Sequence, residues 1–276
     1  NTKKTFYKNK IHNGIKFNLI NDDIKILLKK YKFNRVVLLS AISDPDICLR
    51  NKDYSNKLNV VKTKNLIDVL IKKNIYFIFF SSEYIFDGKK GDYSENSKAV
   101  PSNLYGRQKL QVENFIRKKA KYYSIFRIGK TYGSDISDKT LISNFLMEII
   151  KGKLIFKVAY DQIFNPLYVS DLKKIVRIFL KKKIIGTFNV GGPEQLSRLE
   201  VLKLIFQVLG SKIQSKAQFQ RISLKEFPTL DNRPLNVSMN IDKLKSKINF
   251  KLKNIRNITL KMIKKNNVKS KIFKRR

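Results

Sequence analysis

The stretch Tyr76-Phe77-Ile78-Phe79-Phe80-Ser81-Ser82-Glu83-Tyr84 decides the fold of this 276-residue chain. Its apolar run begins at Ile75 and is short, rich in aromatic residues and closed by polar residues. Such a run is typical of a strand that is buried on both faces of a parallel sheet. We therefore predict a buried strand that presents Ser82 at its carboxyl end.

A helix is expected after this strand, beyond a loop that contains Gly88 and Pro101. Three apolar residues, Val112, Phe115 and Ile116, recur at the spacing of one helix face. Near the start of the same helix, Tyr105 and Lys109 are four residues apart, so their side chains should lie on one side.

Tyr105, Lys109 and Ser82 together indicate a catalytic unit. A free phenol keeps its proton up to a pKa of about 10 and is a poor acid or base near neutrality. A neighbouring ammonium favours the phenolate and should bring the pKa of Tyr105 toward the working pH. The hydroxyl of Ser82 could hydrogen-bond the same carbonyl oxygen that Tyr105 protonates. Tyr and Lys at this spacing also occur on ordinary helices, and it is the preceding strand-end serine that favours catalysis.

Two motifs resemble a known family. Ser-Ser-Glu-Tyr-x-Phe-Asp-Gly from Ser81 and Pro-x-x-x-Tyr-Gly-Arg-x-Lys from Pro101 resemble the extended short-chain dehydrogenase/reductases, most of all the dTDP-4-dehydrorhamnose reductase branch. The resemblance covers most of the chain. It implies a doubly wound α/β fold with a Rossmann-type parallel core and a small C-terminal substrate lobe. It also implies NADP or NAD as cofactor and a nucleotide sugar as substrate.

The resemblance assigns further residues to the site. Ser82, Tyr105 and Lys109 would be catalytic, and Tyr105 and Lys109 would also contact the cofactor. The remaining cofactor positions are Ser40, Ala41, Asn59 and Arg127, and the substrate positions are Glu83, Tyr84, Gln162, Asn165 and Arg233. Arg233 would pair the substrate diphosphate, a task that suits a guanidinium fork, although simple exposure would explain it equally well.

The front of the chain departs from the family. A dinucleotide-binding fold opens with a strand and a glycine-rich turn whose amides meet the pyrophosphate. Between Asn1 and Asp87 this chain has a single glycine, Gly14. We expect the first strand and its loop, about 30 residues, to lie upstream if a full fold exists. Loss of that central strand would indicate a truncated reading frame or a degraded copy without activity.

The predicted organisation has three parts. Residues 1–160 would form the incomplete NAD(P)-binding core, 161–262 the substrate lobe with a returning core strand near 186–192, and 263–276 a frayed basic tail. Ser170 or Asp171 should cap a helix over 172–180. Ser197 and Glu200 have the spacing of a capping box at the start of another helix.

The composition of the chain disfavours several classes of function. The chain has 59 Lys and Arg against 21 Asp and Glu, a net charge of +38. Because the lysines are spread along the whole chain, we interpret them as solvated faces rather than as a specific nucleic-acid surface; steeply salt-dependent binding would favour the latter. One cysteine and one histidine disfavour disulfides, a zinc site and a histidine triad, and no apolar run is long enough to span a membrane. A cytoplasmic protein is expected, with a homodimer as the candidate assembly.

The leading hypothesis is reduction of a nucleotide-linked 4-keto-sugar in deoxysugar or surface polysaccharide biosynthesis. Within the same fold, an epimerase or dehydratase is the alternative, although Glu83 is followed by Tyr84 and not by a second acid, which disfavours a dehydratase. A non-catalytic family member that binds or regulates a partner is a further alternative, favoured by the absent glycine loop. A sequence-independent nucleic-acid binder is the third class.

Overall fold

A computed structural model describes residues 3–7 and 10–273. At its centre is a four-stranded parallel sheet in the order β10-β5-β4-β3. Its strands are β3 (Arg35–Leu38), β4 (Tyr76–Ser82), β5 (Tyr123–Ile128) and β10 (Gly186–Val190). This α/β architecture confirms the predicted Rossmann-type core, and the decisive apolar run forms its interior strand β4.

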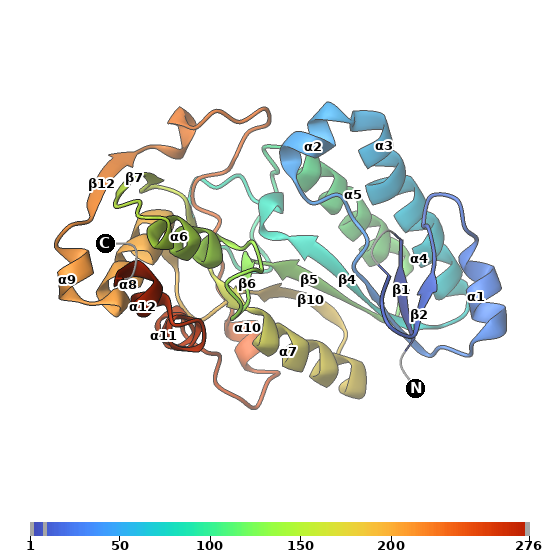
Figure 1. Cartoon of the computed structure of the whole chain (residues 1–276). Coiled ribbons are helices and arrows are strands. Elements are labelled where there is room, and N and C mark those ends of the chain that lie inside the picture. The colour runs from blue at the N-terminus through green and yellow to red at the C-terminus, as the bar shows by residue number, and fades with distance from the viewer. Residues whose placement is uncertain (1–2, 8–9, 274–276) are drawn as a thin grey trace.

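Helices cover both faces of this sheet (Figure 1). On one face lie α2 (Pro45–Arg50), α3 (Lys52–Asn56), α4 (Thr63–Lys72) and α5 (Leu104–Lys119), and on the other lies α7 (Val169–Lys182). Because successive side chains of a strand point to opposite faces, Phe77 and Phe79 of β4 pack in the cluster with α4 and α5, while Tyr76 and Ile78 pack in the cluster with α7. β4 is therefore apolar on both sides.

The helical stretch formed by α3 and α4 changes its winding between these two helices. Between α3 and α4 the residues Lys57–Lys62 form a π-helical segment, and Asn59 lies within it. Such π segments are rare and often lie near functional sites.

The C-terminal lobe has a core of its own. Its elements are α6 (Leu141–Ile150), β7 (Ile155–Ala159), α8 (Arg198–Leu209), β12 (Gln218–Ile222), α11 (Ile255–Lys265) and α12 (Val268–Phe273). Residues from all of them belong to one hydrophobic cluster. The predicted boundary at residue 160 was therefore wrong: α6 and β7 belong to the lobe, whereas α7, which was assigned to the lobe, packs on the sheet.

The basic C-terminal segment is helical over most of its length. α11 and α12 bury Met262, Ile263, Val268 and Ile272, which are at most 4% exposed. The prediction of a frayed tail was wrong up to residue 273, and residues 274–276 lie outside the described part. Isolated apolar residues at helical spacing are sufficient for packing even when lysines fill the intervening positions.

One of the two predicted helix caps is present. α8 begins with the capping box, in which the Ser197 side chain accepts from the N–H of Glu200 and the Glu200 side chain accepts from the N–H of Ser197. α7 instead begins at Val169 without a side-chain cap. Asp171 is buried in its first turn and accepts a 2.7 Å hydrogen bond from the N–H of Lys253, so it ties the lobe to α7.

The front of the chain forms a separate small unit. β1 (Lys4–Phe6) pairs in parallel with β2 (Gly14–Lys16), and α1 (Ile24–Lys30) follows and lies against α4. Within residues 3–7 and 10–273, no strand pairs with the outer edge of β3. Among the described residues, the four-stranded sheet therefore ends at β3.

Short elements complete the chain. They are β6 (Thr131–Tyr132), β8 (Ile163–Phe164), β9 (Leu167–Tyr168), β11 (Leu196–Ser197), α9 (Ser211–Gln214), α10 (Asp242–Lys245) and two single 3-10 turns, Glu83–Ile85 and Leu224–Glu226. None of the helices in the described part of the chain has the length and apolar character needed to cross a bilayer.

Candidate active site

Ser82, Tyr105 and Lys109 meet at the carboxyl end of β4. Ser82 is the last residue of β4, and Tyr105 lies in the first turn of α5, whose start is capped by Asn103. The Ser82 hydroxyl lies close enough to the Tyr105 phenol to lower its pKa in part. The Lys109 Nζ atom lies 5.6 Å from the centroid of the Tyr105 ring. The structure thus brings together the three residues that the sequence predicted to be catalytic.

Gly106 allows α5 to approach the end of β4 this closely. A Cβ atom at this position would lie 2.0 Å from the carbonyl oxygen of Tyr84 and 2.9 Å from Pro101. Any larger residue would push α5 away from the turn that follows Ser82. The glycine therefore fixes the distance between the strand-end hydroxyl and the phenol.

The pKa values of Tyr105 and Lys109 differ from the expected ones. Burial raises the pKa of Tyr105 above its ordinary value, which the hydrogen bond from Ser82 offsets only in part. Burial also lowers the pKa of Lys109 to about 8, and its ammonium donates a 2.8 Å hydrogen bond to the carbonyl of Phe80. The expectation that Lys109 lowers the pKa of Tyr105 was wrong, because desolvation by burial raises this pKa and Lys109 is not among the groups that lower it. Tyr105 is therefore protonated at neutral pH, so a proton is present at the position from which it could be donated.

The carboxyl group of Glu83 is a second proton donor beside Tyr105 and Lys109. Its side chain is 3% exposed, and its Oε2 atom has no hydrogen-bond partner among the described residues. Burial raises the pKa of Glu83 to about 8, although the charge and the backbone N–H of Lys130 lower it in part. A carboxyl group with this pKa is mostly protonated at pH 7 and can donate a hydrogen bond.

Tyr84 forms an aromatic wall next to Tyr105. The two rings meet edge to face with their centroids 6.4 Å apart, and the Lys130 Nζ atom lies 5.7 Å from the centroid of Tyr84. Aromatic pairs prefer such geometry. The pair therefore presents a fixed apolar surface with one cation above it.

Gln162 and Arg198 form a polar pair on the lobe side. Gln162 is completely buried; its Oε1 atom accepts a hydrogen bond from the Arg198 Nε atom, while its Nε2 atom has no partner among the described residues. No carboxylate of a described residue pairs with Arg198. Burial lowers the pKa of Arg198, and the charge of Arg233 lowers it further, which places the two guanidinium groups near each other. Sequence analysis did not identify Arg198; its place beside the Ser197 cap was the available signal.

Arg233 is held between α2 and the lobe. Its guanidinium lies 3.0 Å from Asp46 and 3.6 Å from Asp44, and its side chain is 15% exposed. Nearby, the Asp231 carboxylate accepts a 2.9 Å hydrogen bond from the N–H of Leu104 at the start of α5. This segment therefore joins the lobe to both helices that flank the site, and Arg233 is not simply exposed.

The predicted cofactor contact at Arg127 was wrong. Arg127 is 3% exposed, and its guanidinium pairs with Glu113 at 3.0 Å and donates to the carbonyl of Glu95 at 3.0 Å. Glu113 also accepts a hydrogen bond from Ser81. All of these groups have hydrogen-bond partners inside the core. Strand β5 places Arg127 beneath α5, beside Glu113.

Asn59 and Asn165 hydrogen-bond the backbone of neighbouring segments. Asn59 accepts from the N–H of Ile42 at 2.9 Å, and its amide donates to the carbonyl of Ile42 and to Gln108. Asn165 accepts from the N–H of Met239 at 2.7 Å and donates to the carbonyl of Gly192 at 3.3 Å. Both side chains therefore position neighbouring segments, and the contact of Asn59 with a cofactor and that of Asn165 with a substrate stay predictions.

Two of the predicted cofactor residues, Ser40 and Ala41, lie directly after β3. Ser40 is exposed and Ala41 is half-buried directly after this strand, and Asn59 fixes the backbone at Ile42 beyond them. Gly14 lies in β2, where an added Cβ atom would meet Ile11 and Phe6, and not at the start of a helix. The described residues thus contain Ser40 and Ala41 at the end of β3 but no glycine-rich turn for a pyrophosphate.

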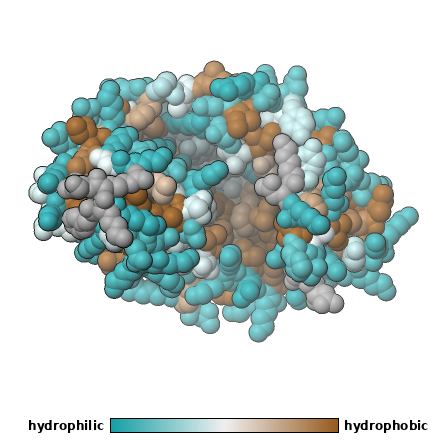
Figure 2. Space-filling view, in the orientation of Figure 1, coloured by the Kyte–Doolittle hydropathy of each residue, from teal (hydrophilic) through white to brown (hydrophobic). Residues whose placement is uncertain are grey.

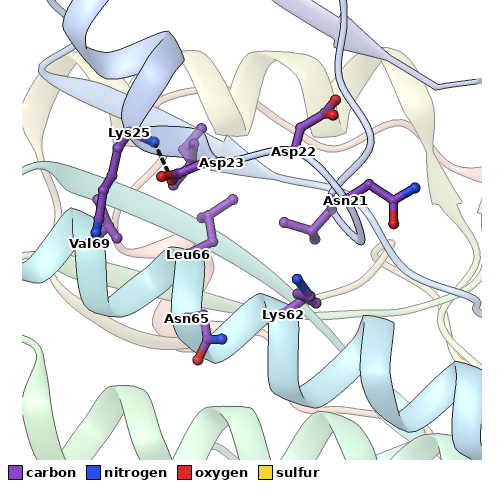
Figure 3. A pocket seen from close by; sticks show the side chains of 10 residues that line it. Asn21, Asp22, Asp23, Lys25, Lys62, Asn65, Leu66 and Val69 are labelled. Carbon is purple, nitrogen blue, oxygen red and sulfur yellow. Dashed lines mark hydrogen bonds between the residues drawn. The ribbon is translucent and has the colours of Figure 1, made fainter.

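A cleft lies between the start of α1 and α4 (Figure 3). Leu66 and Val69 form part of its apolar wall, while Asp22, Asp23 and Lys62 give it charges of both signs. Ser82, Tyr105 and Lys109 do not line it, so it is separate from the catalytic group.

Comparisons with known proteins agree with this fold. Residues 18–268 match the family profile described as RmlD substrate binding domain. The methionine adenosyltransferase 2 subunit beta of Xenopus laevis is 27% identical over 188 residues, covering 64% of this chain and 55% of that protein. The probable low-salt glycan biosynthesis reductase Agl14 of Haloferax volcanii is 26% identical over 187 residues, covering 67% and 62%. This chain therefore spans little more than half the length of the curated relatives it matches.

Solved structures share the architecture at lower sequence identity. The dTDP-4-dehydrorhamnose reductase of Yersinia enterocolitica superposes with a TM-score of 0.81 at 20% identity, covering 90% of this chain and 87% of that one. At this level of identity the likeness establishes the shared fold.

Proposed function

Because this chain belongs to the RmlD substrate binding domain family, we propose that it reduces a nucleotide-linked 4-keto-sugar with NADP or NAD as cofactor. The observation that carries the proposal is the buried group of Ser82, Tyr105 and Lys109 at the end of β4. A phenol that keeps its proton and a hydroxyl aimed at it are the groups that carbonyl reduction requires on the oxygen side.

Tyr105 acts as the proton donor in the proposed reaction. The keto oxygen of the sugar accepts hydrogen bonds from the Ser82 hydroxyl and the Tyr105 phenol, and the phenol proton moves to this oxygen as negative charge develops there. A bound nicotinamide would supply hydride to the carbonyl carbon. Lys109, held by the carbonyl of Phe80, stabilises the resulting phenolate with its charge and retains N–H groups for a ribose hydroxyl.

The residues fit only part of the cofactor. Tyr105 and Lys109 suit the nicotinamide ribose, and Ser40 and Ala41 at the end of β3 leave room beside it. The described residues lack the backbone amides of a glycine-rich turn that would hold the pyrophosphate. We therefore propose cofactor binding that is weak in this chain by itself.

The substrate would lie between the two parts of the structure. Tyr84 offers its ring to the sugar, Glu83 donates a hydrogen bond from its neutral carboxyl, and Arg198, Arg233 and Gln162 face the anionic part of the nucleotide. Charge-assisted hydrogen bonds from guanidinium groups suit a diphosphate. The single cysteine of the chain is compatible with activity in a reducing cytoplasm.

A non-catalytic role is the second candidate. Two observations favour it: relatives named methionine adenosyltransferase 2 subunit beta match this chain, and no glycine-rich turn precedes Gly88 in the described residues. In this role the same fold would bind a partner protein, and Tyr105 would have no effect on the partner's activity.

The two candidates are separated by Tyr105→Phe. Oxidation of NADPH or NADH with a dTDP-linked 4-keto-sugar should fall by about 100- to 10,000-fold in this variant. The half-exposed Tyr54 provides a matched control, because Tyr54→Phe makes the same chemical change outside the site. Turnover that is absent in the unaltered chain, despite binding of both sugar nucleotide and cofactor, would contradict the reductase and favour the partner-binding role.

A further inference from the structure

Lys130 lies just beyond the end of the strand next to β4. The last residue of β5, Ile128, pairs with Ser82 at the end of β4, and Lys130 follows two residues later. In parallel sheets, ligands bind at the carboxyl ends of the strands. The surface is hollowed between the central sheet and the C-terminal lobe, where β4 and β5 end (Figure 2). Lys130 therefore belongs to the same end of the sheet as the catalytic group, although the predicted site does not include it.

The side chain of Lys130 is held beside the aromatic wall. Its backbone carbonyl accepts a 2.8 Å hydrogen bond from the N–H of Leu167, at the start of β9. Its Nζ atom lies 5.7 Å from the centroid of the Tyr84 ring and 5.8 Å from that of the Phe164 ring. The faces of aromatic rings attract cations. The ammonium is thus kept next to Tyr84, whose ring meets Tyr105 edge to face.

Lys130 and Glu83 are two hydrogen-bond donors that lack an acceptor. No Asp or Glu among the described residues forms an ion pair with Lys130. Glu83 interacts with its charge, but burial raises the pKa of Glu83 to about 8, so at pH 7 this carboxyl is mostly protonated and compensates the charge little. The Oε2 atom of Glu83 has no partner among the described residues, and a Cβ atom at Gly129 would lie 3.4 Å from it. The unpartnered oxygen is therefore next to the backbone that leads into Lys130.

A carboxylate is the group that suits these two donors. Its two oxygen atoms can accept from an ammonium and from a protonated acid at the same time, and its charge compensates that of Lys130. A sugar hydroxyl could accept the same hydrogen bonds but would leave the ammonium without a counter-charge beside apolar rings. The diphosphate of a nucleotide sugar has other partners, since Arg198 and Arg233 lie near each other on the lobe side.

We propose that Lys130 and Glu83 bind a carboxylate on the sugar ring, so that the preferred substrate is a nucleotide-linked uronic acid derivative. The proposal rests on the proposed function for the binding of a nucleotide sugar at this site. In a 4-keto-uronic acid the carboxylate is attached to the ring carbon next to the carbonyl. The protein places the corresponding groups in the same order, because Glu83 directly follows Ser82, the residue assigned to the carbonyl oxygen.

The test compares dTDP-glucuronic acid with dTDP-glucose, which differ only in the carboxylate that replaces a hydroxymethyl group. In calorimetry with the full chain, the uronic acid should bind about 10- to 100-fold more tightly. Lys130→Met keeps the apolar stem and should remove this preference while leaving the affinity for dTDP-glucose unchanged. Lys130→Arg keeps the charge and should retain most of the preference. Glu83→Gln keeps a neutral donor and should retain it as well.

Lys119 provides the control for the overall positive charge of the chain. Its Nζ atom lies 4.9 Å from the centroid of the Phe115 ring, and it is the last residue of α5, whereas Tyr105 lies in the first turn. Lys119→Met should leave the preference unchanged, and circular dichroism shows that each variant is folded. Equal affinities of the unaltered chain for the two sugars, or a preference that survives Lys130→Met, would overturn the proposal. An equal loss in Lys119→Met and Lys130→Met would overturn it in favour of the diffuse field of the lysines.

Turnover is measured separately, as oxidation of NADPH or NADH with a dTDP-linked 4-keto-sugar. A preference for the uronic acid that depends on Lys130, without turnover of any 4-keto-sugar, would contradict the reductase and support the carboxylate site. Turnover of a neutral 4-keto-sugar, together with equal affinities for the two probes, would support the reductase and overturn the carboxylate site.

Discussion

The Lys109 ammonium lies 5.6 Å from the centroid of the Tyr105 ring but donates its 2.8 Å hydrogen bond to the carbonyl of Phe80. The lysine is thus anchored to strand β4, one residue before Ser81, and not to the phenol. Helix α5 and strand β4 share this contact, which holds the catalytic tyrosine against the strand end. Because both side chains are buried, each is uncharged more readily than in water.

Lys109 should make stability rise with pH in an alkaline window. Burial lowers its pKa from 10.5 to about 8 in the folded chain. Between these values the unfolded chain binds the proton that the folded chain has lost, so the free energy of unfolding increases as the pH rises. Lys109→Met should remove this increase. Urea unfolding from pH 7 to 10 measures it, with Lys203→Met as an exposed control; parallel profiles for the unaltered chain and Lys109→Met would contradict it.

Glu83 should have the opposite effect at lower pH. Burial raises its pKa from 4.5 to about 8, so between these values the folded chain keeps a proton that the unfolded chain has released. The free energy of unfolding therefore falls as the pH rises through this window. Glu83→Gln, which mimics the neutral acid, should flatten the fall, whereas Glu148→Gln on the exposed surface of α6 should not. An identical pH profile for Glu83→Gln would show that the carboxyl is already ionised.

The sequence alone was sufficient to predict the elements whose structure depends on local patterns. The apolar run of β4 and the spacing of Val112 and Ile116 located the strand, the helix and hence the meeting of Ser82 with Tyr105. These features depend on residues that are near in sequence or lie on one regular element.

Contacts between distant segments could not be predicted. Arg198 was missed because its partner Gln162 is 36 residues away and neither residue has a distinctive local pattern. The direction of the pKa of Tyr105 depends on desolvation, which only the packed structure determines. Arg127 was assigned to the cofactor from its place in a motif, whereas the fold places it against Glu113.

Arg127 and Arg117 allow a matched test of whether Arg127 has a structural role beside Glu113. Both pair with Glu113, at 3.0 and 2.7 Å, but the side chain of Arg127 is 4% exposed and that of Arg117 is 35% exposed. Arg127→Gln should lower the free energy of unfolding by about 3–5 kcal/mol, because it leaves a buried carboxylate without its main partner. Arg117→Gln should lower it by about 1 kcal/mol or less. Urea unfolding gives both values, and equal small losses would contradict a structural role for Arg127.

Arg198 should determine affinity for the anionic part of the substrate. It has no carboxylate partner among the described residues, and Gln162 fixes its Nε atom, so its outer nitrogen atoms can bind a diphosphate. Losing a charge-assisted hydrogen bond costs about 1.5–3 kcal/mol, so Arg198→Gln should bind dTDP about 10- to 100-fold more weakly in calorimetry. Arg221→Gln, on exposed β12, is the control for the general positive charge. If both variants lose the same affinity, the diffuse field of the lysines holds the nucleotide; if only Arg198→Gln does, the buried guanidinium holds it.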